Sequence, residues 1–267
     1  GRLECPEGQD HFGTDERMGR LCRGLAEAKI PTVVTLHTVH STASALVERL
    51  WGFRGFMREL GRNANHVVIH QHRKMLELVE REMPRPAPGQ ALVAVHGSGL
   101  CHSDVGRMDG TLTPFMPKPP PIVLGHEIAG EVVATGGDVN DPLPGDRVVA
   151  SGPLAFCPGR DADGGYATHC LLPSHCLLPL PASVDFVQGA AATDAGQTSH
   201  AALMKAGGLQ PGQRVGIIGL GGLGMTGARI AVLEGATVYA AEPRLDAWDP
   251  ALAHGVAGLV ADASEFS

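Results

Sequence analysis

Two short segments of the sequence carry residue types that could hold a metal ion. The first, Gly99 to Asp104, reads GLCHSD, and the second, Gly125 to Glu127, reads GHE. Together they present a thiolate, an imidazole and carboxylates in what we expect to be loops of a β domain. A catalytic zinc ion requires such a set, because three protein ligands fix it tetrahedrally and leave the fourth position to water or a substrate oxygen. The two segments therefore predict a catalytic zinc site.

A glycine-rich segment further along the chain predicts a nucleotide site. It follows the apolar strand pattern VGIIG and opens a helical pattern, so that backbone N–H groups and the helix N-terminus can bind a pyrophosphate. An acid, Glu242, ends the next predicted strand, where it would accept hydrogen bonds from the adenine ribose hydroxyls and disfavour a 2′-phosphate. We therefore expect NAD rather than NADP, and we interpret Arg244 as a solvated surface residue. The expected cofactor-binding residues are Gly219, Gly221, Gly222, Leu223, Gly224 and Glu242.

The elements that must position these residues follow from two changes of pattern along the chain. From Pro84 to about Pro181, short β segments alternate with proline and glycine clusters, which is typical of a barrel-like β domain. From Asp185 onward, helical and strand patterns alternate, and VGIIG, the next helix and ATVYAAE form one β-α-β unit. Residues 1–65 read as helix, strand and helix, and the following MLELVERE fits either a strand or a helical turn.

These motifs resemble those of the zinc-containing medium-chain alcohol dehydrogenase family. GHE, the GDRV turn from Gly145 to Val148 and the DGGYA segment from Asp163 to Ala167 stand in the family's order, and the resemblance covers about Val67 to Ser267. It implies a GroES-like β-barrel catalytic domain at 66–184 and an incomplete Rossmann NAD-binding domain at 185–267. We therefore expect an α/β plus β protein with a short α/β segment, residues 1–65, in front.

The resemblance implies three ligands for one catalytic zinc ion. Cys101 and His126 match two of them, and Asp194 stands where the third is commonly a cysteine; an aspartate oxygen is an ordinary zinc ligand. Many family members hold a structural zinc with four cysteines in the loop after the GDRV turn, whereas this chain has only Cys157 there. We expect no structural zinc. HCLLPSHC, residues 169–176, falls where the family has strands, and we expect it to pack in the core.

Four further residues acquire roles through the same resemblance. Glu127 matches the acidic neighbour that lies behind the metal or moves onto it, and Asp104 matches the carboxylate that orients a ligand. Ser103 matches the hydroxyl that takes the substrate proton, and His102 a contact to cofactor phosphate. The histidine that continues the family's proton relay is replaced by Gly106, so the proton must leave by another route.

Both ends of the sequence depart from this family. The stretch PTVVTLHTVHS, from Pro31 to Ser41, with the following helix pattern and ANHVVIH, resembles a fragment of a group 1 glycosyltransferase but carries no donor-sugar or catalytic motif. We assign it no activity and interpret His37 and His40 as strand-end residues. At the other end, a dinucleotide fold requires two β-α-β-α-β halves and the sequence contains about the first. We expect this truncation to remove the nicotinamide side of the pocket.

Composition excludes several classes of function. The 267 residues carry a net charge of −7 without a dense run of lysine and arginine, so a nucleic-acid partner is not expected. No apolar stretch approaches the roughly 18 residues that cross a bilayer. The 6 cysteines include no CxxC pair, which indicates a reducing, cytoplasmic setting. The expected partner is a small alcohol or carbonyl substrate, and a homo-oligomer is left open.

The predicted activity is hydride transfer between an alcohol and NAD, assisted by zinc. The alternative is a catalytically incompetent truncated or fusion remnant, in which the zinc loops persist but nicotinamide is not oriented for transfer. Zinc-free quinone or enoyl reduction on the same scaffold is disfavoured by the cysteine and histidine pair. A glycosyltransferase function for the whole chain is disfavoured because its donor site would fall on GHE and the glycine-rich segment.

Overall fold

The computed structural model describes residues 33–35, 65–71, 75–151 and 156–266. The chain divides into two compact units: Gly1–Val39 with Thr198–Ser267, and His40–Gln197. Apart from residues 33–35 and the first residue of β2, the glycosyltransferase-like segment predicted at 1–65 lies outside the described residues. The domain boundaries predicted at 65/66 and 184/185 stay predictions.

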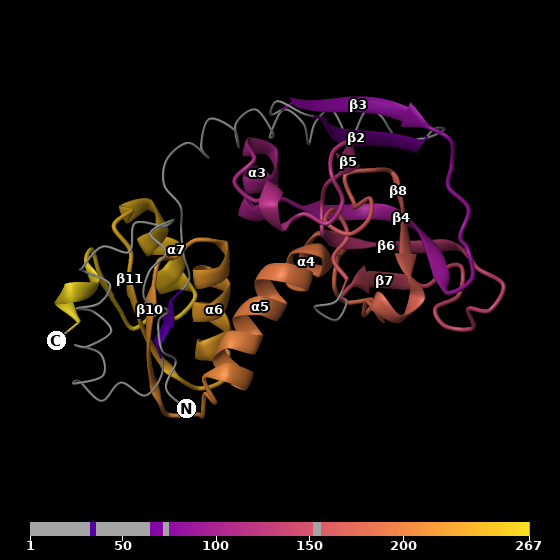
Figure 1. Ribbon diagram of the computed structural model, residues 1–267. Coiled ribbons are helices and arrows are strands. Elements are labelled where there is room, and N and C mark those ends of the chain that lie inside the picture. The colour runs from indigo at the N-terminus through magenta and orange to yellow at the C-terminus, as the bar shows by residue number, and fades with distance from the viewer. Residues whose placement is uncertain (1–32, 36–64, 72–74, 152–155, 267) are drawn as a thin grey trace. The chain divides into compact units, whose positions relative to one another are not determined.

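The unit His40–Gln197 is built on two antiparallel sheets (Figure 1). The larger sheet has the order β8-β4-β6-β7-β9 and contains β4 (Gln90–Gly99), β6 (Glu127–Thr135), β7 (Arg147–Ala150), β8 (His169–Pro173) and β9 (Leu177–Pro179). The smaller has the order β3-β2-β5 and contains β2 (Asn65–Gln71), β3 (Met75–Arg81) and β5 (Ile122–Val123). MLELVERE, which allowed two interpretations, thus contributes a strand paired antiparallel with β2.

The core of the larger sheet follows from alternation along its strands, because successive side chains point to opposite faces. In β8, Cys170 and Leu172 are buried between partly exposed neighbours, and Cys170 packs with Val93 of β4. Cys176 is buried as well, in the short 3-10 helix η2 (Ser174–Cys176). The core packing predicted for HCLLPSHC is therefore confirmed for both cysteines.

Short helices and helical turns connect strands of this unit or follow them along the chain. They are α3 (His102–Asp109), the 3-10 turn η1 (Thr113–Phe115), α4 (Phe186–Ala191) and the π-helical turn η3 (Ala192–Gly196), which leads into α5 (Gln197–His200). Helix α4 begins where the Asp185 carboxylate accepts a hydrogen bond from the backbone N–H of Gln188 at 2.7 Å, an ordinary N-cap. Helix α4 packs on strands β4 and β6 and so sets the direction of the chain that reaches η3.

The second unit contains a parallel sheet with the order β1-β10-β11-β12. Its elements are β1 (Val33–Thr35), η4 (Ala201–Ala206), β10 (Arg214–Ile218), α6 (Gly222–Leu233), β11 (Thr237–Ala241), η5 (Leu245–Ala247), α7 (Trp248–Ala253), β12 (Gly258–Val260) and η6 (Ala263–Glu265). The predicted β-α-β unit is present as β10-α6-β11. Strand β1, from the N-terminal segment, pairs in parallel with β10.

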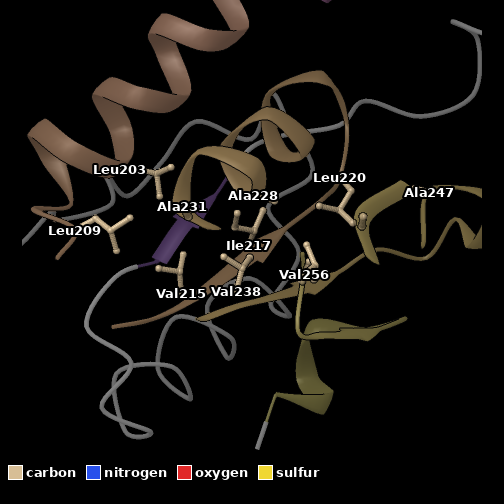
Figure 2. Close-up of a cluster of buried hydrophobic side chains, with 12 residues drawn as sticks. Leu203, Leu209, Val215, Ile217, Leu220, Ala228, Ala231, Val238, Ala247 and Val256 are labelled. Atoms are coloured by element: carbon tan, nitrogen blue, oxygen red, sulfur yellow. The ribbon is translucent and has the colours of Figure 1, made fainter. Parts of the chain in front are cut away.

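The core of this unit lies between α6 and the sheet (Figure 2). Ala228 and Ala231 of α6 are buried against Ile217 of β10 and Val238 of β11, all four with no exposed surface. The small side chains on α6 let the helix approach the sheet closely, which places the turn before α6 at the carboxyl end of β10. Across the part of the chain that the structure describes, every helix is too short or too polar to cross a membrane.

Candidate metal centre and glycine-rich turn

Four side chains of the unit His40–Gln197 form one cluster of metal-ligand atoms. Cys101, His126, Glu127 and Asp194 each offer one such atom, and these atoms lie within 4.8 Å of one another. The sheet brings two of the segments together, because Gly99 at the end of β4 pairs with Glu127 at the start of β6. Asp194 arrives from the π-helical turn η3. The donors come from three separate parts of the sequence.

Two glycines make room for this cluster. A Cβ on Gly99 would collide with the Glu127 carboxylate, so the absence of a side chain at position 99 lets that carboxylate turn toward the cluster. Gly125 has a φ of 93°, a conformation that favours glycine, and a Cβ there would lie 2.6 Å from the ring of Tyr166. The GLCHSD and GHE motifs thus need their glycines for close approach as well as their ligand residues.

The His126 ring has a defined orientation between two carboxylates. Its Nε2 lies 3.5 Å from Asp194 Oδ2 and 3.5 Å from Ser103 Oγ, on the side of the metal-ligand cluster. Its Nδ1 lies 3.4 Å from Asp104 Oδ1 on the opposite side. A carboxylate behind a ligating histidine fixes the tautomer and the ring plane. This arrangement suits a histidine that binds a metal through Nε2 while Nδ1–H faces Asp104.

Hydrogen bonds fix the Asp104 side chain, and one of the donors, the Tyr166 hydroxyl, was not predicted from the sequence. The Asp104 side chain has no exposed surface, and Oδ2 accepts hydrogen bonds from the Cys101 backbone N–H at 3.2 Å and the Tyr166 hydroxyl at 2.9 Å. Burial and the nearby Asp104 charge raise the pKa of Tyr166, so the hydroxyl stays a donor. Tyr166 stands in the DGGYA segment that supported the family resemblance, which was the available signal for its role.

The electrostatics of the cluster suit a cation. Burial alone would lower the pKa of His126, but hydrogen bonds to Asp104, Asp194 and Cys101 outweigh it and raise that pKa to about 12. Burial and the neighbouring Asp194 charge raise the pKa of Glu127 to about 7. Neighbouring carboxylates contribute to both shifts, and a positive ion would offset their charge. A thiol, an imidazole and carboxylates are also the ligand types that zinc prefers, so these residues fit that ion.

The remaining predicted residues of this region take up different positions. Ser103 lies beside His126, whereas His102 is exposed at the start of α3. Gly106, which stands where the family's relay histidine is expected, is buried, and a Cβ there would lie 3.0 Å from the Leu112 side chain. An apolar side chain therefore packs against the position that a relay histidine would use.

The glycine-rich turn connects β10 to α6 in the other unit. Gly219 has a φ of 84° and its N–H donates to the Ala241 carbonyl at 2.8 Å, which ties the turn to the end of β11. A Cβ on Gly224 would collide with the Gly219 carbonyl oxygen, so only glycine allows the helix to start this close to the strand. Gly221 is the N-cap of α6 and has no side chain with which to cap the first backbone N–H groups. These groups suit an anion.

Glu242 is buried next to this turn and already has partners. Its Oε2 accepts a hydrogen bond from the Leu220 backbone N–H at 2.7 Å, and its Oε1 accepts from the Arg244 backbone and Nε, both at 3.0 Å. Burial acts to raise the pKa of Glu242, but the hydrogen bonds from Arg244 and Leu220 prevail and lower it. Arg244 is exposed, as expected of a surface residue, but the sequence did not indicate its partners: its guanidinium pairs with Glu242 and also donates to the Leu220 carbonyl at 3.2 Å.

The chain is similar to several known proteins over part of its length. Residues 87–182 match the family described as the alcohol dehydrogenase GroES-like domain. The chain is 34% identical over 194 residues to an alcohol dehydrogenase of Geobacillus stearothermophilus, which covers 66% of this chain and 56% of that relative. It is 31% identical over 203 residues to an NAD-dependent alcohol dehydrogenase of Sulfurisphaera tokodaii, covering 67% and 58%.

A solved structure extends the similarity to the fold. Acetophenone reductase from Geotrichum candidum in complex with NAD aligns with a TM-score of 0.65 and 30% identity, over 75% of this chain and 64% of that one. The chain thus spans less than two thirds of each of these relatives. The matched family thus accounts for residues 87–182, and the wider similarities are to proteins named alcohol dehydrogenase or acetophenone reductase.

Proposed function

We propose that this chain belongs to an oxidoreductase that transfers hydride between an alcohol and NAD with one catalytic zinc ion. The observation that carries the proposal is the cluster of Cys101, His126, Glu127 and Asp194, whose ligand atoms lie within 4.8 Å of one another. Cys101, His126 and Asp194 would hold the metal, and Glu127 would lie next to it. The similarity to named alcohol dehydrogenases supports the same activity.

Each residue near the cluster has a task in this proposal. A bound zinc ion would supply a Lewis acid that makes an alcohol oxygen more acidic. Ser103, whose hydroxyl lies 3.5 Å from His126 Nε2, would accept the substrate proton and pass it to water, because Gly106 offers no relay side chain. Asp104 holds His126 through Nδ1 at 3.4 Å. His102, exposed at the start of α3, would contact a cofactor phosphate.

The proposed nucleotide site consists of the turn Gly219–Gly224 and Glu242. The backbone N–H groups at the start of α6 would bind the pyrophosphate, and Glu242 the adenine ribose. NAD is supported by the NAD-dependent relative and by the NAD complex of the similar structure. Because the Arg244 guanidinium is already hydrogen-bonded to the Glu242 carboxylate, binding of the ribose to Glu242 would require this guanidinium to move aside.

We also propose a substrate class, a zinc content and a cellular compartment for this chain. The substrate would be a small alcohol or carbonyl compound. One zinc per chain is proposed, because one group of potential ligands stands out among the described residues. Of the six cysteines, the four that lie in described residues, Cys101, Cys157, Cys170 and Cys176, are free, which suits a reducing compartment such as the cytoplasm.

NADH formation tests the proposal directly. The purified chain, loaded with zinc, is mixed with NAD and a panel of primary and secondary alcohols, and absorbance of NADH is followed. The proposal predicts turnover that a chelator abolishes and added zinc restores. Zinc binding without NAD affinity and without turnover would instead support the incompetent remnant.

A further inference from the structure

A buried cation lies behind the metal-ligand cluster, at a position that the motifs did not single out. Arg107 is on α3 and only 6% of its surface is exposed. Its Nη1 lies 3.4 Å from Asp104 Oδ1 and 3.5 Å from His126 Nδ1. A buried guanidinium is stable only when it is paired, because removal from water is costly. Its pairing with Asp104 therefore belongs to the same network as His126.

Arg107 also contacts the loop that follows β7. Its Nη1 donates to the Gly159 carbonyl at 3.2 Å, and its Nη2 lies 3.9 Å from Cys157 Sγ. Gly159 in turn packs on the residue before His126, since a Cβ on Gly159 would lie 2.9 Å from the Gly125 nitrogen. The guanidinium thus joins α3 to a loop that lies directly against the turn carrying His126.

The two oxygens of Asp104 explain why the arginine matters. Oδ2 is held by the Cys101 N–H and the Tyr166 hydroxyl. Oδ1 is shared between His126 Nδ1 at 3.4 Å and Arg107 Nη1 at 3.4 Å. With Arg107 in place, the carboxylate is fixed at both oxygens and its charge is balanced. Without it, a fully buried carboxylate would lose its neighbouring cation, and Oδ1 would be held by the imidazole alone.

We propose that Arg107 is a positioning residue of the metal site, which holds Asp104 and Gly159 so that the His126 ring keeps Nε2 directed toward Asp194. The inference rests on the proposed function, because it concerns the same metal site. Arginine suits this role better than lysine, since its planar fork offers several donors in fixed directions. The guanidinium meets Asp104 and Gly159 through Nη1 and approaches Cys157 through Nη2, whereas a lysine would offer a single nitrogen.

The experiment compares zinc affinity and ligand geometry in four versions of the full chain. These are the unaltered chain, Arg107→Met, Arg107→Lys and the control Arg160→Met; Arg160 lies on the same loop and pairs with Asp161 at 2.8 Å. Zinc affinity is measured by competition with a chelator, the absorption spectrum is recorded with cobalt in place of zinc, and thermal unfolding is followed without metal. Removing a partner that orients a metal ligand typically weakens metal binding about 10- to 100-fold.

We expect Arg107→Met to weaken zinc binding within that range and Arg107→Lys to weaken it near the lower end. Both should alter the cobalt spectrum, while Arg160→Met leaves affinity and spectrum unchanged. If Arg107→Met does not fold, the zinc affinity and cobalt spectrum of Arg107→Lys, which keeps the positive charge, test the inference. Zinc affinity and a cobalt spectrum equal to those of the unaltered chain in a folded Arg107 variant would overturn the inference and leave the proposed function standing. An unaltered chain that does not bind zinc would overturn both.

Discussion

The metal-ligand cluster and the glycine-rich turn build their sites in opposite ways. The cluster uses side chains from three distant segments, brought together when Gly99 of β4 pairs with Glu127 of β6 and when η3 carries in Asp194. The turn uses the backbone of six consecutive residues, with glycine required where a Cβ on residue 224 would meet the Gly219 carbonyl. A site of side chains depends on the whole sheet, whereas a site of backbone groups depends on local conformation.

The two regions also differ in charge. Around His126 the acidic groups outnumber the cations, so the cluster favours a positive ion. At the start of α6 the backbone N–H groups favour an anion, and the nearby acid Glu242 is paired with Arg244. The comparison therefore predicts that metal binding and nucleotide binding can be lost separately, each through a change in its own unit.

The largest effect is expected from Cys101→Ala. This change removes one of the three proposed ligands. Zinc binding to a protein site contributes roughly 10 to 16 kcal/mol, and about a third of that free energy corresponds to a loss of affinity on the order of a thousandfold. Chelator competition measures the loss, and calorimetry should show NAD binding unchanged. The control is Cys176→Ala, a buried cysteine outside the cluster. Zinc affinity retained in Cys101→Ala would remove this residue from the site.

Gly224→Val should weaken NAD binding and leave zinc binding unchanged. Its side chain would be forced against the Gly219 carbonyl, so the start of α6 must shift away from β10. Overpacking of this kind costs about 1–3 kcal/mol, and NAD affinity should fall by roughly 10- to 100-fold. Zinc content, measured on the same sample, should not change. If zinc and NAD binding fell together, the independence of the two units would be contradicted.

Zinc affinity should rise with pH. In the metal-free chain the pKa of His126 is raised to about 12, so the imidazole is protonated at neutral pH and must lose a proton to ligate. One displaced proton corresponds to about tenfold in affinity per pH unit, with tighter binding at higher pH. Chelator competition between pH 6 and pH 8 measures this slope. Asp104→Asn should reduce this slope, because it removes a hydrogen bond that raises the pKa of His126. A zinc affinity that does not change with pH in the unaltered chain would contradict the explanation.

The smallest effect is expected from Arg244→Ala. Removal of the guanidinium frees Oε1 of Glu242 for a ribose hydroxyl and takes away a group that would attract a 2′-phosphate. The ratio of NAD affinity to NADP affinity should rise about tenfold, the equivalent of one hydrogen bond to a charged group. Calorimetry with both cofactors checks this, with Arg229→Ala, whose side chain donates to the His254 carbonyl, as control. A lower ratio would mean that Arg244 assists NAD.

The sequence predicted the local features well and the network behind the metal poorly. The β10-α6-β11 unit could be predicted because VGIIG, the glycine spacing and the helix pattern are contiguous. Cys101 and His126 could be identified through short motifs. Tyr166 and Arg107 could not, because their roles depend on the packing of the DGGYA segment and the loop at Cys157 against Gly125. The spacing of Asp104 and Arg107, three residues apart on a helix, was the weak signal available.

The pairing of Arg244 with Glu242 was missed for a similar reason. An arginine two residues after a strand is usually solvated, and only the turn that follows β11 directs this one back onto the carboxylate. Charged side chains have long reach, so their partners depend on backbone turns that sequence patterns define loosely. Glycines with a fixed close contact, such as Gly224, are predictable because only one residue type fits.

A crystal structure of the zinc-loaded chain, with anomalous scattering recorded at the zinc absorption edge, tests the central claim most directly. We predict one strong peak at about 2.3 Å from Cys101 Sγ and about 2.0–2.1 Å from His126 Nε2, with an Asp194 oxygen completing the protein ligands. At a zinc concentration between the dissociation constants of the two versions, the peak should be absent from Cys101→Ala crystals. A peak elsewhere on the chain, or none at this cluster, would contradict the assignment of a metal centre to these residues.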